Sequence, residues 1–277
     1  MKRLISIELQ KIWKNKASRV LTLTYFVLLS FIALIASIKF DIGNLKFHLA
    51  EMGIFNFPYI WHFNTYIADF FKFFLAIVIV SMMANEYSYG TLKQNLIDGM
   101  SKKEFIQSKF LTVVLFALAS TIFVFVMTLI LGLCFSSYNE PSIIFSEMEY
   151  LVAFFVKLIG FFSLCLFLGI LVKRSAFALG FLLVGYFAEW IIYALVRWQF
   201  FNEKIADAMA KFFPLNAISN LIVEPITRLS PVRTAQAQIG ASQVKDYTVH
   251  FSSIAIVLTW TVIFVLSSHF LLKKRDL

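Results

Sequence analysis

The sequence predicts an all-α polytopic membrane protein with six transmembrane helices. Hydrophobic residues make up 60% of the 277 positions, charged residues only 15%, and 33 positions are Phe. A soluble domain is nearer half apolar and about a quarter charged, so this balance indicates a bilayer as the solvent. Six apolar runs also reach the roughly 20 residues that a helix needs to cross a bilayer. They lie near 20–38, 66–84, 110–135, 151–172, 176–196 and 252–272.

The distribution of basic residues predicts the orientation. An even number of spans places both termini on one side. Lys and Arg gather in the N-terminal segment, in the loop after the second run, at Lys173 and Arg174, and in the C-terminal tail. The positive-inside rule therefore predicts a multi-pass protein of the cell membrane, inner or plasma, with both termini cytoplasmic. The net charge of +9 follows from this asymmetry and suits anionic lipid headgroups, so we expect no nucleic-acid partner.

The chain, 1–277, reads as one membrane domain with three notable segments outside the spans. The first, 1–19, has an apolar face at helical spacing, formed by Ile5, Leu9, Ile12 and Trp13. This pattern predicts an amphipathic helix that lies in the cytoplasmic interface and contacts lipid. An ordinary basic tail is the alternative.

The second segment, 85–109, is a polar cytoplasmic loop between two apolar runs. It can form a short helix over Gly90–Ile97, with Leu92, Leu96 and Ile97 on one side. Asp98 and Gly99 form a turn signal that would end this helix. A polar hairpin without a partner is the alternative.

A further helix is predicted directly after that turn. Ser101 and Glu104 match a capping box, in which each residue bonds the other's backbone N–H. The new helix would begin at Lys102 and continue into the third apolar run. The loop is therefore predicted to fold as a helix, a break and a second helix.

The third segment, 197–250, is predicted to be an extracellular loop that holds short helices before the last span. Pro214 and Pro225 bracket an apolar stretch that is too short to cross a bilayer. We expect this stretch to form an interfacial or re-entrant helix, whose polar groups need partners or water.

Four ionisable residues fall inside the predicted spans: Asp69, Lys72, Lys157 and Glu189. A charge at this depth is costly unless it faces protein or water and finds a partner. Lys157 and Glu189 lie at similar distances on either side of the turn at Lys173, so we expect them to approach each other. Structural pairing that fixes helix packing is the simpler interpretation. The alternative places these charges along a substrate path or at an outer gate.

The sequence lacks the usual signatures of catalysis. It has no G-x-x-x-x-G-K-[ST] loop for nucleotide phosphates, no H-E-x-x-H, and no cluster of His or Cys at metal-ligand spacing. We therefore expect no catalytic residues, no metal site and no cofactor bound by this chain. It is not predicted to be an enzyme by itself.

One motif and the overall layout together carry a family resemblance. The motif is Glu86-x-x-x-Gly90-Thr91-Leu92, followed by a turn, Ser101-Lys102 and then Lys109. With its six predicted spans, cytoplasmic termini and outer loop before the last span, the chain resembles the ABC-2 type permease subunits of ATP-binding-cassette exporters. The detailed match covers only 85–109. It departs from the family's commonest form at Asp98-Gly99-Met100, where a proline often precedes the serine or threonine.

The resemblance implies a transmembrane permease domain that works in a complex. It would pair with a second permease subunit, as a homodimer or heterodimer, and with two copies of a cytoplasmic ABC ATPase. ATP and Mg would be bound by that ATPase, and this chain would form the export path. The short helix would be a coupling helix seated on the ATPase, with the coupling residues Glu86, Gly90, Thr91, Leu92, Lys93, Leu96 and Ile97.

Two other classes stay open. A membrane-embedded enzyme would need Glu, His and Asn together inside the spans, and the spans offer only Glu189 besides Asp69. A secondary transporter driven by ions would usually have spans broken by Gly or Pro near mid-membrane, and these spans contain no Pro.

Overall fold

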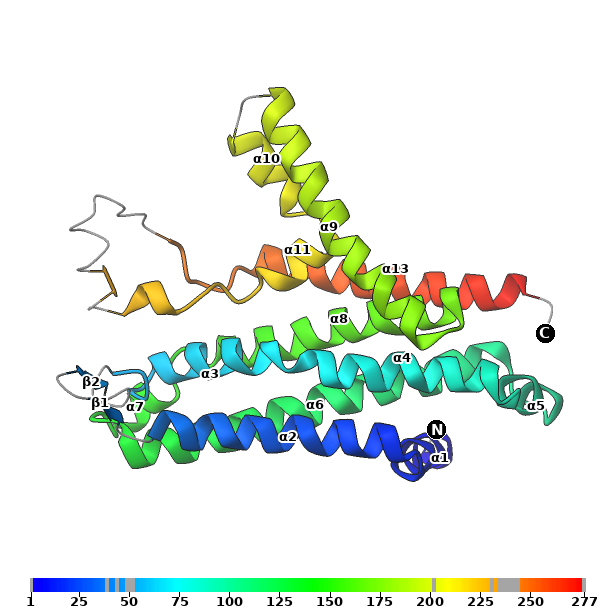
Figure 1. Cartoon of the computed structure of the whole chain (residues 1–277), viewed down its shortest axis with the longest axis horizontal. Coiled ribbons are helices and arrows are strands. Elements are labelled where there is room, and N and C mark those ends of the chain that lie inside the picture. The colour runs from blue at the N-terminus through cyan, green and yellow to red at the C-terminus, as the bar shows by residue number, and fades with distance from the viewer. Residues whose placement is uncertain are drawn as a thin grey trace.

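The computed structural model is a bundle of long helices with a small two-stranded hairpin at one end (Figure 1). It describes residues 2–37, 40–42, 45–47, 53–200, 203–229, 232–233 and 245–275. The N-terminal helix, the short α5 and the C-terminal end of the last helix lie at the end of the bundle opposite the hairpin (Figure 1). The molecule therefore has two distinct ends, joined by long helices.

The elements follow in chain order. The first half comprises α1 (Lys2–Lys14), α2 (Lys16–Ser37), β1 (Phe40–Ile42), β2 (Leu45–Phe47), α3 (Tyr59–Phe70), α4 (Lys72–Ser88), α5 (Thr91–Ile97) and α6 (Lys102–Phe135). The second half comprises α7 (Pro141–Ile144), α8 (Glu149–Val172), α9 (Ser175–Phe200), α10 (Glu203–Ala210), α11 (Pro214–Ser219), the 3₁₀ turn η1 (Ile226–Arg228) and α13 (Phe251–Lys274). β1 and β2 pair antiparallel, with Phe40 opposite Phe47.

Several helices are long and apolar enough to cross a membrane. Among the described residues these are Lys102–Phe135, Pro141–Val172, Ser175–Gln199 and Phe251–Lys274, with α3 and α4 as a fifth if the bent pair is one span. The described fold is therefore almost entirely helical and fits a multi-pass membrane protein, and four of the predicted runs are confirmed as long helices. The run at 20–38 coincides with α2 up to Ser37 but is not among these segments, so six spans stay a prediction.

The second predicted run, 66–84, is not one continuous helix but falls on α3 and α4. The chain bends by 45° between α3 and α4. At the bend, the N–H of Phe71 bonds the carbonyl of Ala68, and the N–H of Phe74 bonds the carbonyl of Phe71. These three-residue hydrogen bonds replace the four-residue bonds of an α-helix and tighten the chain locally. No Pro or Gly marks the position, so the sequence carries no breaker signal there.

α8 is the centre of the bundle. It packs against α3, α4, α6, α9 and α13, and its side chains are buried on almost every face. A helix that is apolar all round suits this position. α9 differs sharply, because it leaves the bundle at a steep angle together with α10 (Figure 1). Many of its large apolar side chains are exposed, including Phe187 and Trp190.

The N-terminal segment folds as the amphipathic helix α1, but its apolar face is divided. Ile12 is buried against the bundle, whereas Leu9 and Trp13 are exposed. The polar Glu8 is also buried. α1 therefore packs on the protein with one side, and its predicted position in the lipid interface would use the other.

Candidate functional site

A group of charged side chains lies where α1, α4, α5 and α6 meet. The fully buried ammonium of Lys109 contacts a carboxylate oxygen of Glu8 and one of Glu86, each at 2.6 Å. Lys11 reaches the same oxygen of Glu86 at 2.9 Å. The hydroxyl of Thr91 donates to the other oxygen of Glu86 at 2.6 Å. These five residues, called the junction cluster below, join four helices through side-chain contacts alone.

The junction cluster balances its charges. Two carboxylates face two ammonium groups, and Thr91 satisfies a further carboxylate oxygen. Removing a charge from water costs several kcal/mol, and attraction offsets this cost only when the geometry is good and the remaining polar atoms are bonded. Losing Lys109 would leave two buried carboxylates with only the partly exposed Lys11 as a partner. α5 is therefore firmly connected to α4 at its first residue, Thr91.

The helix–break–helix of 85–109 forms as predicted. Gly90 precedes α5 with a φ of 67°, and Gly99 follows it with a φ of 97°, both in the left-handed region that favours glycine. Ser101 and Glu104 form the reciprocal capping box at the start of α6. These local signals place Thr91 beside Glu86, and they hold α5 at the end of the bundle.

The predicted apolar face of α5 is wrong in part. Leu92 is only 2% exposed and packs in this chain's own core, whereas Ile97 is 75% exposed. Residues five apart lie about 140° apart around a helix, so Leu92 and Ile97 cannot share one face. Leu96 is half-buried, and Lys93 is exposed. The surface of α5 that is free to meet another protein is thus formed around Lys93 and Ile97.

A second charged group lies farther along the bundle, at the α3–α4 bend. The carboxylate of Asp69 contacts the ammonium of Lys72 at 2.8 Å and that of Lys157 at 3.0 Å. Lys72 also lies 4.7 Å from the centre of the Phe161 ring. Three of the four predicted intramembrane charges thus come together. Asp69, Lys72 and Lys157 are called the mid-bundle cluster below.

The predicted approach of Lys157 to Glu189 is wrong, because the short helix α11 contacts both α8 and α9. Lys157 donates to the carbonyl of Ser219, at the C-terminal end of α11, at 2.9 Å. The two carboxylate oxygens of Glu189 accept the backbone N–H groups of Leu215 and Asn216, at the other end, each at 2.8 Å. Comparing heights along two neighbouring helices could not reveal a third element between their charges.

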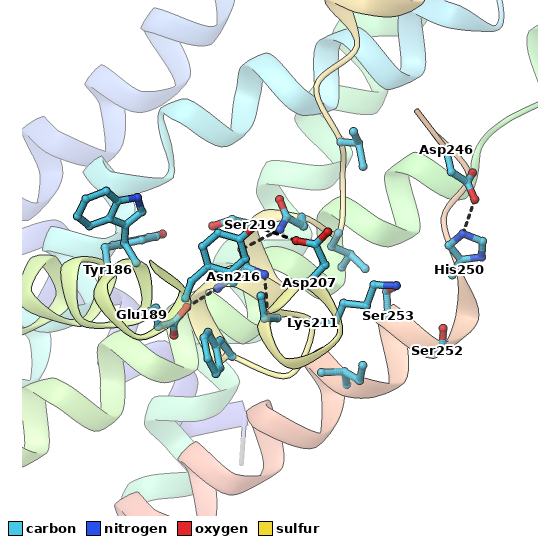
Figure 2. A pocket seen from close by; sticks show the side chains of 18 of the residues that line it. Tyr186, Glu189, Asp207, Lys211, Asn216, Ser219, Asp246, His250, Ser252 and Ser253 are labelled. Carbon is cyan, nitrogen blue, oxygen red and sulfur yellow. Dashed lines mark hydrogen bonds and ion pairs between the residues drawn. The ribbon is translucent and has the colours of Figure 1, made fainter. Parts of the chain in front are cut away.

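A cavity of about 920 Å³ opens beside α11 (Figure 2). Its walls come from α9, α10, α11 and the start of α13. Figure 2 shows Glu189 beside Asn216 on one side of the cavity and His250 paired with Asp246 on the other. Asp207 accepts a hydrogen bond from the hydroxyl of Tyr193. The lining is mixed, with carboxylates, amides and aromatic rings, so it suits a molecule that has both polar and apolar parts.

Asp246 lies at the rim, outside any candidate span. Hydrogen bonds from the side chain and backbone N–H of Thr248, followed by one from His250, lower its pKa from 3.8 to about 2. The carboxylate therefore stays ionised under ordinary conditions. The described residues contain no group of three or more His, Cys, Asp or Glu side chains placed to hold a metal ion.

Comparison with known proteins places the chain in a family. A family model described as "Protein of unknown function (DUF2705)" matches residues 26–277. The chain belongs to this family. It is also similar to the "Uncharacterized protein YhcI" of Bacillus subtilis (strain 168), with 33% identity over 79 residues. That match covers 27% of this chain and spans about a quarter (25%) of the relative's length.

In this DUF2705 protein, the sequence motif contains only part of the junction cluster. Glu86, Thr91 and Lys109 belong to the motif, whereas Glu8 and Lys11 come from α1, which precedes the matched residues. The only available signal is that Glu8 is the single acidic residue in a basic helix. A lone acidic residue there fits a polar surface equally well, so its role could not be predicted.

Proposed function

We propose that this protein is the transmembrane permease subunit of an ABC exporter of the ABC-2 type, coupled through α5 to a separate ATP-hydrolysing subunit. One observation carries the proposal. α5 is a short helix at one end of the bundle, and the junction cluster connects it to α1, α4 and α6 through buried charges. A helix held in this way can pass a displacement to the long helices without bending at its attachment.

The mechanism uses each part in turn. Two ATPase subunits bind ATP and Mg and close on each other. Each contacts the exposed face of α5, around Lys93 and Ile97, and displaces it. Because Thr91 and Glu86 join α5 to α4, the displacement reaches α4, and through Lys109 it reaches α6 and α1. Two permease subunits, identical or similar, then open the export path between them.

The membrane arrangement follows from this proposal. α2 would be a sixth span, so both termini and α5 lie in the cytoplasm. α1 would rest at the inner membrane surface with Leu9 and Trp13 toward lipid. The cavity beside α11 would then face the outer half of the membrane.

A second candidate is a secondary transporter driven by ions. The bend between α3 and α4, with Asp69 and Lys72 on either side of it, favours this alternative, since broken helices carrying charges occur in such transporters. α5 and the junction cluster have no assigned task in that scheme. Transport by the purified protein without any ATPase would support it.

The test is reconstitution with a candidate P-loop ATPase, such as one encoded by a neighbouring gene. The ATPase should co-purify, and its ATP hydrolysis should change when the permease is present. Ile97→Asp should abolish this change. Ile226→Asp, at an exposed isoleucine toward the opposite end of the bundle, is the matched control and should leave it intact. Equal behaviour of the two variants would count against the proposal.

A further inference from the structure

We infer that α11 is a movable closure of the outer end of the path, and that Glu189 and Lys157 are positioning residues that hold it shut. This inference rests on the proposed function and extends it to the far end of the molecule. The hydrogen bonds from α11 to these two side chains are called the α11 anchor below.

The α11 anchor has opposite charges at opposite ends of one six-residue helix. The carboxylate of Glu189 accepts the first free N–H groups, those of Leu215 and Asn216. The ammonium of Lys157 binds the carbonyl of Ser219 at the last turn. A negative group at the N-terminus and a positive group at the C-terminus match the polarity of a helix. The two charges come from different long helices, so α11 is held between α9 and α8.

α11 packs closely against α8 and α9, and the surface of these two helices that it covers is called its seat below. A Cβ atom added to Gly160 of α8 would lie 3.4 Å from the side chain of Ile218, and one added to Gly185 of α9 would lie 3.1 Å from Leu215. Glycine at these two positions lets the short helix approach both neighbours. Leu215 and Ile218 are buried in the seat, whereas Asn216 and Ser219 line the cavity. One side of α11 is therefore core, and the other is the cavity wall.

A single helix connects this seat with the junction cluster. Lys157 shares Asp69 with Lys72, which is the first residue of α4. The other end of α4 carries Glu86 of the junction cluster. A movement of α4 about the bend at Phe71 would shift Lys72 and, through their 2.8 Å ion pair, Asp69. Lys157 would then lose its place between Asp69 and the carbonyl of Ser219.

Charged contacts explain why this element could open. Lys157 is 1% exposed, and its one carboxylate partner in the described part of the chain is Asp69, so its position depends on Asp69. When Asp69 moves, the ammonium must follow to avoid being buried without compensation. The C-terminal end of α11 is then released, while its N-terminal end stays on Glu189. α11 would swing away from its seat and widen the cavity toward the outside.

The experiment measures how accessible the seat of α11 is. Ala217, which is 8% exposed, is replaced by Cys in a Cys134→Ser background, and Cys165 is kept because it is fully buried. A membrane-impermeant maleimide is added to the full-length protein in liposomes. Glu189→Gln and Lys157→Met should each raise the labelling rate about tenfold, the factor expected when one hydrogen bond to a charged group is lost. Asp207→Asn lines the same cavity without contacting the α11 anchor, and it should label at the starting rate.

The outcomes separate this inference from the proposed function. Labelling that rises in the presence of the ATPase with ATP and vanadate, and also in the two anchor variants, supports both. A rise in the variants without any effect of ATP supports the closure and contradicts the ATPase coupling. An effect of ATP without any effect of the variants overturns the closure and leaves the exporter function standing. If Lys157→Met also exposes Cys165, unfolding is the cause, and Glu189→Gln, which keeps the side-chain shape, decides alone.

Discussion

The junction cluster and the mid-bundle cluster solve the problem of buried charge in different ways. In the junction cluster two carboxylates face two lysines, and every partner is a side chain. In the mid-bundle cluster the single carboxylate of Asp69 pairs with two lysines. One of them, Lys157, also donates to a backbone carbonyl of the short helix α11. The junction cluster therefore needs no backbone partner. The mid-bundle cluster depends on α11 being in its observed position, so it is the cluster that would change if α11 moved.

The largest expected loss of stability comes from a substitution in the junction cluster. Lys109→Met would leave the buried carboxylates of Glu8 and Glu86 with only the partly exposed Lys11, which lies 3.7 Å from Glu8 and 2.9 Å from Glu86. Breaking a buried pair in this way costs about 3–5 kcal/mol. The melting temperature in detergent should fall strongly. Lys103→Met, at an exposed position on the same helix, is the control and should change little. A similar loss in both variants would show that the junction cluster has no special role.

A smaller loss of stability is expected from a substitution in the mid-bundle cluster. Lys157→Met leaves Asp69 still paired with Lys72 and removes one bond to the Ser219 carbonyl, so we expect a cost of about 1–3 kcal/mol. A double-mutant cycle should show stronger coupling between Asp69 and Lys157 than between Lys157 and Glu189, because only the first two are in contact. Stronger coupling of Lys157 with Glu189 would contradict the geometry.

α5 offers a comparison within one helix. Leu92→Asp places a charge in the core and should destabilise the protein, since an unpaired buried charge is costly. Ile97→Asp should change stability by less than about 0.5 kcal/mol, as expected for an exposed site. It should nevertheless remove the response of the ATPase. Thermal unfolding and ATP hydrolysis of the complex, measured on both variants, would show whether stability and coupling separate in this way.

The smallest effect is expected at the cavity rim. The lowered pKa of Asp246 stabilises the fold when the pH is above 3.8, and this contribution is lost as the pH falls from 3.8 toward about 2. Asp246→Asn should flatten this part of the pH profile of the unfolding midpoint. It should lower the midpoint slightly at neutral pH, where the contribution of the carboxylate is fully present, and leave it unchanged below a pH of about 2. The change at neutral pH is small because the group is exposed. A large effect at neutral pH would mean that the rim is more tightly built than its contacts indicate.

The sequence predicts features that local chemistry determines. The left-handed glycines and the capping box define the ends of α5 and the start of α6, and all these signals lie within a few residues of one another. Contacts between elements that are far apart in the chain could not be predicted in the same way. The bend at Phe71 has no Pro or Gly, and Lys157 is kept apart from Glu189 because α11 contacts both α8 and α9. The role of Glu8 depends on where α1 docks, which helical periodicity does not determine.

The most direct test of the account is the accessibility of position 97. In a Cys134→Ser background, Ile97→Cys should react readily with a maleimide in the permease alone and only from the cytoplasmic side of intact cells. Adding the ATPase subunit should protect it. Reaction from the outside, or equal reaction with and without a bound ATPase, would contradict the claim that α5 is the coupling element.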